Sequence, residues 1–248
     1  MSVALVAGGA TGIGAAVVDA LRARGDDVLL ADRNESAGAA TVELALPGRA
    51  RFFPCDLATP HGPARAVAAA VEFGEGRLDT VFYNAGILVA KPLREWTVAD
   101  WDLSLAVNLR GAFLTVQAAQ DYLAASDCGR VILTSSTGAL RGHAGMPAYH
   151  ATKAGLIGIV RSLADELGPL QTTVNAICPG WVDTAFNDSF WDHQKSPTEA
   201  LDSLVAQIPL GRQALPADIA GTVLFLASSA SAYMTGQALV IDGGYTAV

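Results

Sequence analysis

Short apolar runs rich in β-branched residues alternate along this chain with longer amphipathic stretches, and this pattern limits the possible folds more than any other feature. The short runs are continuously apolar, whereas a strand with one face in water alternates apolar and polar residues. We therefore predict an α/β fold, a Rossmann-like doubly wound parallel sheet of about seven strands with helices on both faces. The predicted strands are Val3–Ala7, Asp27–Ala31, Arg51–Pro54, Thr80–Tyr83, Arg130–Thr134, Thr173–Ile177 and Ala238–Ile241, and the predicted helices are Ile13–Arg24, Gly62–Phe73, Val98–Asn108, Ala112–Ala124, Ala148–Leu167 and Pro216–Ala227.

The composition favours a single domain over residues 1–248. No Pro-rich, Ser-rich or uniformly charged stretch divides the chain. A hydrophobic fraction of 51% and a charged fraction of 16% are typical of a globular chain with many buried strands. The net charge of −8 argues against nucleic acid or an anionic membrane as a partner, because both require a basic face.

The cysteines and the N-terminal residues predict a cytoplasmic protein. Cys55, Cys128 and Cys178 are far apart, with the spacing of neither a zinc site nor a disulfide framework. The chain begins without a basic region and a long apolar region, and no apolar run is as long as a membrane span. The four histidines lack metal-ligand spacing, so we expect no metal site.

A glycine-rich turn follows the first predicted strand and precedes the first predicted helix, with glycines at positions 8, 12 and 14. Glycine allows a tight turn and lets the backbone and the helix N-terminus approach a pyrophosphate. A turn of this kind often has no other role, but its position after the first strand predicts a dinucleotide site. The expected phosphate-binding residues are Gly8, Thr11, Gly12, Ile13 and Gly14.

Asp32 ends the second predicted strand, where a carboxylate can accept hydrogen bonds from the hydroxyls of an adenosine ribose. The same charge repels the 2′-phosphate of NADP, which favours NAD. Arg33 complicates this preference, because a guanidinium can stack on adenine, bind a 2′-phosphate or simply face solvent. We predict NAD as the cofactor, with NADP the less favoured alternative.

Polar and small residues follow the next two predicted strands. Asp56, followed by Leu57, is placed to meet the adenine ring, although a role as a helix cap or turn residue stays equally open. Asn84, Ala85 and Gly86 form a small-residue stretch along which a cofactor can pass close to the backbone. All five residues are predicted to contact the cofactor.

Tyr149 precedes Lys153 by four residues, and Ser136 lies thirteen residues upstream of the tyrosine. Residues four apart share one face of a helix, so a phenol and an ammonium at this spacing can act on one substrate and one cofactor. Many solvated helix faces carry the same pair, so the spacing alone is weak. Its place after a phosphate loop and a ribose-binding acid indicates a proton-transfer site.

Taken in order, these residues resemble the short-chain dehydrogenase/reductase family over the whole chain. Two support positions depart from the family pattern: Ala7 stands where the glycine motif begins with Thr, and Tyr83 replaces the first Asn of Asn-Asn-Ala-Gly. Neither position reacts. The matching residues are Gly8, Gly12, Ile13, Gly14, Asp32, Asp56, Asn84, Ala85, Gly86, Asn108, Ser136, Tyr149, Lys153, Pro179, Gly180, Thr184 and the stretch 235–244.

The resemblance implies a role for each catalytic residue. Tyr149 would be the general base in alcohol oxidation and the general acid in ketone reduction. Lys153 would favour the phenolate and bind the nicotinamide ribose, and Ser136 would bind the reacting oxygen. Asn108 would hold a water that relays the proton from the lysine, although a backbone kink is an equal alternative. Ser135 is a second candidate hydroxyl, but the thirteen-residue spacing selects Ser136.

The resemblance also implies the remaining cofactor contacts and the assembly. Pro179, Gly180, Val182 and Thr184, which follow the sixth predicted strand, are expected to contact the cofactor. The family usually forms homotetramers, so we expect one here. The predicted function is hydride transfer between NAD and a small secondary alcohol or ketone; the alternatives are an NADPH-dependent 3-oxoacyl thioester reductase and a non-catalytic nucleotide-binding module.

An aromatic stretch within residues 181–210 stands where the family places its substrate lid. Its aromatics suggest an apolar or ring-shaped substrate, or else they close the core or a subunit contact. His143 lies between the serine and the tyrosine, in a loop expected to border the substrate. The candidate substrate residues are Ser136, His143, Met146, Trp181, Phe186 and Phe190.

Overall fold

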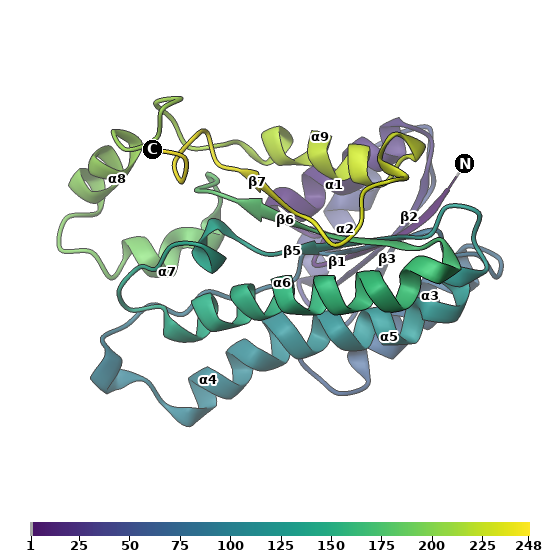
Figure 1. The fold of residues 1–248 in the computed structure, drawn as a ribbon, viewed down its shortest axis with the longest axis horizontal. Helices are drawn as coiled ribbons and strands as arrows, with labels where there is room; N and C mark the ends of the chain where they lie inside the picture. The colour runs from purple at the N-terminus through teal and green to yellow at the C-terminus, as the bar shows by residue number, and fades with distance from the viewer. Residues whose placement is uncertain (1) are drawn as a thin grey trace.

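A seven-stranded parallel sheet runs through the computed structural model, which describes residues 2–248 (Figure 1). Its strand order is β3-β2-β1-β4-β5-β6-β7, so the chain builds outward from β1 in one direction and then returns to build in the other. The strands are β1 Val3–Ala7, β2 Asp27–Asp32, β3 Ala50–Pro54, β4 Thr80–Tyr83, β5 Arg130–Thr134, β6 Thr173–Pro179 and β7 Ala238–Ile241.

Helices cover both faces of the sheet (Figure 1). One layer holds α1 and α9, with α2 beside them, and the other holds α3, α5 and α6, with α4 extending from it. The α-helices are α1 Gly12–Ala23, α2 Glu35–Glu43, α3 Gly62–Phe73, α4 Val98–Leu105, α5 Gly111–Ala124, α6 Pro147–Leu167, α7 Asp188–Trp191, α8 Pro197–Val205 and α9 Pro216–Leu226.

The strands are continuously apolar because successive side chains enter two different cores. In β1, Leu5 and Ala7 pack toward α3, α5 and α6, whereas Ala4 and Val6 pack toward α1 and α9. All of β1 is buried. The doubly wound parallel fold predicted from this pattern is confirmed.

The observed helices differ from the predicted ones chiefly at one boundary and in several short helices that the hydrophobic pattern did not indicate. The helix expected over Val98–Asn108 ends at Leu105 and continues as a π-helical turn over Ala106–Arg110, which we call the π-turn. Helices α2, α7 and α8 were not predicted. The first begins at Glu35 and is capped by Asn34, whose side chain accepts a hydrogen bond from the Ala37 amide.

The carboxyl ends of the parallel strands lie at one edge of the sheet. The direction in which the chain adds strands reverses between β1 and β4. Ligands of doubly wound sheets gather at such an edge. The segment after β6, with α7 and α8, extends over the same end (Figure 1). Among residues 2–248, no helix is both long and apolar enough to cross a membrane.

Candidate active site

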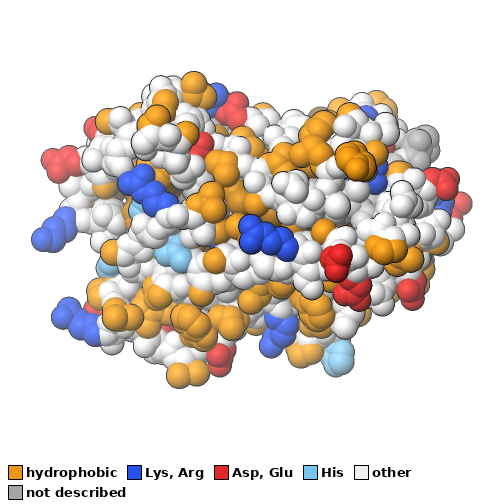
Figure 2. Space-filling model, in the orientation of Figure 1, with side chains coloured by type: hydrophobic (Ala, Val, Ile, Leu, Met, Phe, Trp, Pro, Cys, Tyr) orange, Lys and Arg blue, Asp and Glu red, His pale blue; other side chains and the backbone are white. Residues whose placement is uncertain are grey.

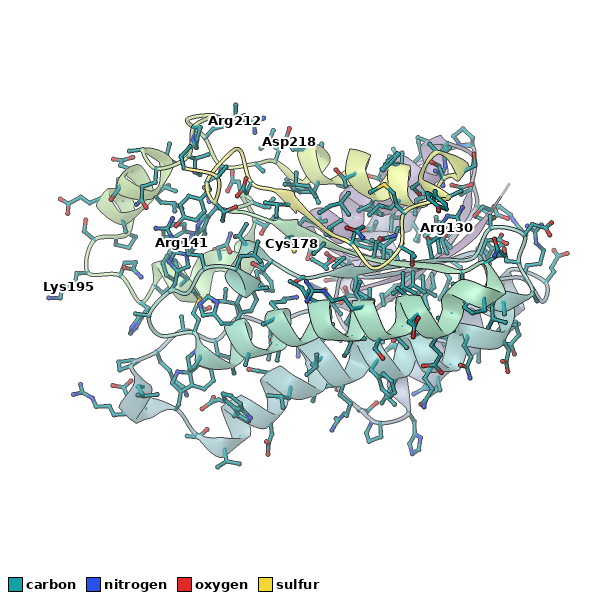
Figure 3. All side chains as sticks on the ribbon, in the orientation of Figure 1. Arg130, Arg141, Cys178, Lys195, Arg212 and Asp218 are labelled. Carbon is teal, nitrogen blue, oxygen red and sulfur yellow. The ribbon has the colours of Figure 1, made fainter. Side chains whose placement is uncertain are left out.

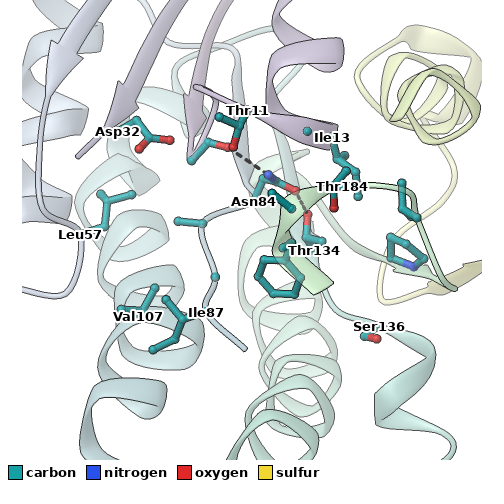
Figure 4. A pocket seen from close by; sticks show the side chains of 18 of the residues that line it. Thr11, Ile13, Asp32, Leu57, Asn84, Ile87, Val107, Thr134, Ser136 and Thr184 are labelled. Carbon is teal, nitrogen blue, oxygen red and sulfur yellow. Dashed lines mark hydrogen bonds between the residues drawn. The ribbon is translucent and has the colours of Figure 1, made fainter. Parts of the chain in front are cut away.

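A cleft of about 480 Å³ opens at the carboxyl ends of β1, β2, β4, β5 and β6 (Figure 4). The structure brings together residues from the whole length of the chain in this cleft. Every residue expected to bind the cofactor lines it except Gly14. The cleft is therefore built from the strand ends that the sequence singled out.

The glycine turn is close-packed and its helix start is open to an anion. A Cβ on Gly8, whose φ is +82°, would lie 2.4 Å from the Ala85 backbone nitrogen, and one on Gly14 would lie 2.0 Å from the Gly8 carbonyl oxygen. Gly14 thus allows the turn to pack closely and does not itself line the cleft. Thr11 precedes α1 without making a side-chain capping bond, and the first turn holds no acid. The first amides of α1 are left for a ligand such as a phosphate.

Asp32 lies beside the glycine turn, at the opposite side of the cleft from Ser136 (Figure 4). Its carboxylate accepts hydrogen bonds from the amides of Ala10 and Asn34, at 3.1 and 2.9 Å. These bonds fix an acceptor where a ribose hydroxyl can reach it. Arg33 is exposed and lines the same end of the cleft.

Asn84 joins three strand ends through its side-chain amide (Figure 4). Its nitrogen donates to the Gly8 carbonyl at 3.0 Å, and its oxygen accepts from the Thr134 hydroxyl at 3.1 Å. The amide thus braces the glycine turn against β4 and β5. At the adenine end, Asp56 accepts from the Ala58 amide at 2.9 Å, so its carboxylate lines the cleft and also forms a turn.

Tyr149, Lys153 and Ser136 meet at the inner end of the cleft. Tyr149 and Lys153 lie on α6, with the Lys153 ammonium 5.6 Å from the centre of the phenol ring. The Ser136 hydroxyl hydrogen-bonds the phenol. Ser135 is occupied elsewhere, because its hydroxyl donates to the Lys153 carbonyl at 2.7 Å.

Burial sets the protonation states of both groups. It raises the pKa of the Tyr149 phenol to about 12, although the Ser136 hydrogen bond acts in the opposite direction. Burial also lowers the pKa of the Lys153 ammonium to about 8. Lys153 does not lower the pKa of the phenol in this structure; its ammonium donates instead to the Thr134 carbonyl at 2.7 Å.

Asn108 lies in the π-turn and is fully buried, so it does not line the cleft itself. Its side-chain oxygen accepts from the Ile87 amide at 2.8 Å, and its nitrogen donates to the Ile87 carbonyl and to the Thr152 hydroxyl. The hydrogen-bonding kink, one of the two alternatives that the sequence left open, is therefore present, and the water-holding role stays a prediction. The residue links the loop after β4 to α6, the helix that carries Tyr149 and Lys153.

Only part of the expected substrate wall faces the cleft. Phe186 lines it, with its ring centre 6.1 Å from that of Tyr149. The other candidates, apart from Ser136, do not line it: His143, Met146, Trp181 and Phe190.

These four residues pack elsewhere. Met146 is buried at the start of α6, and Trp181 belongs to a small core that Phe190 packs against. His143 joins this cluster, with its ring centre 5.4 Å from that of Trp181, and burial lowers its pKa. Arg141 covers the edge of the cluster and lies at the same end of the molecule as Lys195 (Figure 3).

The sequence missed several cleft residues. Ile87 and Val107 are ordinary apolar residues, and no local pattern marks them as part of a site. Thr134 ends β5 beside the two serines, and its position at a strand end was the available signal. Across the described residues, no cluster of His, Cys, Asp or Glu is suited to hold a metal ion.

Comparisons with known proteins find relatives over nearly the whole chain. A family model described as enoyl-(acyl carrier protein) reductase matches residues 8–246. The D-threitol dehydrogenase of Mycolicibacterium smegmatis is 39% identical over 98% of this chain and 92% of its own. The 3-oxoacyl-(acyl-carrier-protein) reductase of Thermotoga maritima is 34% identical over 98% of this chain and 96% of its own.

A solved structure shares the same architecture. The structure of a blue fluorescent protein from a metagenomic library, in complex with NADPH, superposes with a TM-score of 0.89. It is 38% identical and covers 99% of this chain and 98% of its own. The chain is thus similar, over nearly its full length, to proteins named as dehydrogenases and reductases.

Proposed function

The chain belongs to the short-chain dehydrogenase/reductase family of oxidoreductases, and from this premise we propose that it transfers a hydride between NAD and a secondary alcohol or ketone. One observation carries the proposal: Ser136, Tyr149 and Lys153 converge in the same cleft as the open N-terminus of α1 and the Asp32 carboxylate. A proton-transfer group and a dinucleotide site are thus within one cavity.

The residues of the cleft fit a nicotinamide dinucleotide. The amides at the start of α1 have no capping partner, which suits a pyrophosphate, and Asp32 offers a fixed acceptor for a ribose. When bound, the cofactor supplies the hydride donor or acceptor and, in its oxidised form, a positive charge. The chain itself supplies orientation and proton transfer.

Tyr149 is the proposed proton donor and acceptor. With a pKa of about 12 the phenol is protonated at neutral pH, ready to donate to the oxygen of a ketone. Alcohol oxidation requires the phenolate, which we expect the Ser136 hydroxyl to stabilise. Lys153, with its pKa lowered to about 8, exchanges protons close to physiological pH.

We propose NAD rather than NADP because of the charge near the ribose site. Asp32 is held in place by two amides, so a 2′-phosphate would meet a fixed negative charge there. Arg33 is exposed and forms no ion pair with Asp32 among the described residues, so its guanidinium is available to a 2′-phosphate and the proposed preference rests on Asp32.

The second candidate is reduction of a 3-oxoacyl thioester with NADPH. It is favoured by the similarity to the Thermotoga maritima reductase. The Asp32 carboxylate argues against it. Phe186, which lies over the catalytic centre, instead fits a compact apolar or ring-shaped substrate.

A substrate panel with a Tyr149→Phe control tests the proposal. Polyols, cyclic secondary alcohols and hydroxysteroids are supplied with NAD, and acetoacetyl-CoA with NADPH, while absorbance of the reduced cofactor is followed. We expect NAD-linked oxidation of at least one alcohol. Tyr149→Phe should abolish turnover and leave the NAD dissociation constant within about twofold, because the phenol exchanges the proton and contributes little to cofactor affinity. Near wild-type turnover in that variant would refute the assignment.

The lid, the assembly and the location remain predictions. We propose that residues 181–210 form the lid, because Phe186 lies over the cleft and α7 and α8 follow it. Apolar side chains on α4 and α5 are exposed, including Trp101 and Phe113, and hydrophobic atoms gather where these helices lie (Figure 2). This surface supports the expected homotetramer. The cytoplasmic location stays an expectation from the sequence.

A further inference from the structure

Tyr83 ends β4 and is buried behind the cleft, with a relative exposure of 1%. It stands where the family pattern has an asparagine. Its hydroxyl donates to the Val107 carbonyl at 2.7 Å. Tyr83 does not line the cleft, whereas Val107 does, beside Ile87 (Figure 4).

The Val107 carbonyl needs this donor because of the π-turn. In a regular α-helix it would accept from the amide four residues later, that of Gly111. In this protein the Gly111 amide donates to the Ala106 carbonyl, five residues back. The Val107 carbonyl therefore loses its helical partner, and a buried carbonyl without a partner is destabilising. The Tyr83 phenol takes the place of the missing amide.

Gly111 provides the space for the phenol. A Cβ on Gly111 would lie 2.2 Å from the Tyr83 hydroxyl oxygen, which is closer than real Cβ contacts. A residue with a side chain at position 111 would thus displace either the phenol or the π-turn. Tyr83 and Gly111 form a matched pair across the interface between β4 and α5.

The π-turn connects this pair to the catalytic helix. Asn108 follows Val107, and its side chain holds both backbone groups of Ile87 and the hydroxyl of Thr152. Thr152 precedes Lys153 and donates to the Tyr149 carbonyl at 2.8 Å. A shift of the Val107 peptide would therefore move Ile87, which lines the cleft. It would also move the turn of α6 that carries Tyr149 and Lys153.

We propose that Tyr83 is a positioning residue for the reaction: its hydroxyl fixes the π-turn, and the π-turn fixes Ile87 and the catalytic turn of α6. The inference rests on the proposed dehydrogenase function for its effect on turnover. Its effect on the Ile87 backbone does not depend on that function. The two can therefore be tested separately.

The test compares Tyr83→Phe with Ser231→Ala. The control removes a buried hydroxyl that also donates to a helical carbonyl, that of Leu226 at 3.0 Å, far from the cleft. Turnover is measured with the alcohol that the wild-type protein oxidises fastest in the panel, and amide hydrogen exchange is measured at Ile87. We expect kcat to fall on the order of tenfold in Tyr83→Phe, with a smaller change in the KM for NAD, and Ile87 to exchange faster. The control should change neither quantity.

Wild-type kcat in Tyr83→Phe would overturn the inference, as would unchanged exchange at Ile87. Gly111→Ala is the second variant, because its Cβ presses on the same phenol; if Tyr83→Phe does not fold, this variant decides by the same two measurements. If the wild-type protein oxidises no alcohol, the proposed function fails while the Ile87 exchange still decides whether Tyr83 fixes the π-turn.

Discussion

Lys153, which we propose takes part in catalysis, should reduce the stability of the protein at neutral pH. Lys153 is 2% exposed, and its ammonium has one carbonyl partner, that of Thr134. Burial lowers its pKa from 10.5 to about 8 because a charged ammonium is poorly solvated there. Lys153→Met keeps a long side chain and removes the charge, so we expect it to unfold at higher denaturant concentration than the wild type at pH 7.

The size of this stability difference and its dependence on pH follow from the pKa values of Lys153 in the unfolded and the folded protein. Below pH 8 the lysine is charged in both the folded and the unfolded protein, so folding bears the full free-energy cost of burying the charged ammonium. Between pH 8 and 10.5 the folded state releases its proton first, so wild-type stability gains from rising pH. A pKa difference from 10.5 to about 8 corresponds to about 3 kcal/mol at about 1.4 kcal/mol per pH unit. The lost hydrogen bond to Thr134 offsets about 1 kcal/mol of the gain.

Urea unfolding of both proteins at pH 7 and at pH 10 measures this effect. The free energy of unfolding of Lys153→Met should exceed that of the wild type at pH 7, and the difference should shrink at pH 10. Using the difference removes the titration of shared groups that do not interact with Lys153. The Cys178 thiol does not cancel in this way, because burial raises its pKa and the Lys153 charge lowers it. A difference that stays constant between pH 7 and 10 would refute the argument that the buried charge is costly.

Three further variants test other parts of the cleft. Asp32→Ala should raise the ratio of kcat/KM for NADP to that for NAD at least about tenfold, because the fixed charge near the ribose is lost; an unchanged ratio would show that another group sets the preference. Asn84→Ala removes the brace between Gly8 and Thr134, so thermal unfolding should report a loss of about 1–3 kcal/mol, and the KM for NAD should rise. Phe186→Ala should lower kcat/KM about tenfold for apolar alcohols and less for polyols, because burial of an aromatic ring contributes about 1.5–3 kcal/mol; equal losses for both classes would argue against an apolar contact.

The scaffold could be predicted because its signals are local. Each strand of the sheet is a short apolar run, and this pattern holds wherever both faces are covered. The chemistry-bearing residues follow strand ends, so knowing the strands placed Asp32, Ser136 and the glycine turn at one edge. Tyr149 and Lys153 then joined them through a single helix. All of these inferences need only neighbours in sequence and the rule that parallel strands end together.

The substrate side could not be predicted because it depends on packing between distant segments. Trp181 and Phe190 are as aromatic as Phe186, yet they close a small core with Tyr245 from the C-terminal stretch. Nothing in the local sequence distinguishes an aromatic that faces the cleft from one that faces this core. His143 was expected to border the substrate for its position in the loop, but it packs against the same core.

The local rules of folding are broken mainly where the site lies. The N-terminus of α1 lacks a capping bond, Lys153 carries a buried charge, and the helix after α4 gives up a regular hydrogen bond at Val107. Helix α4, away from the cleft, instead begins with a complete capping box at Thr97. Because the first two of these irregularities place donors and a charge toward one cleft, substitutions that remove them should stabilise the fold and impair turnover together. Lys153→Met is the sharpest case, since a gain in stability and a loss of activity would come from the same ammonium.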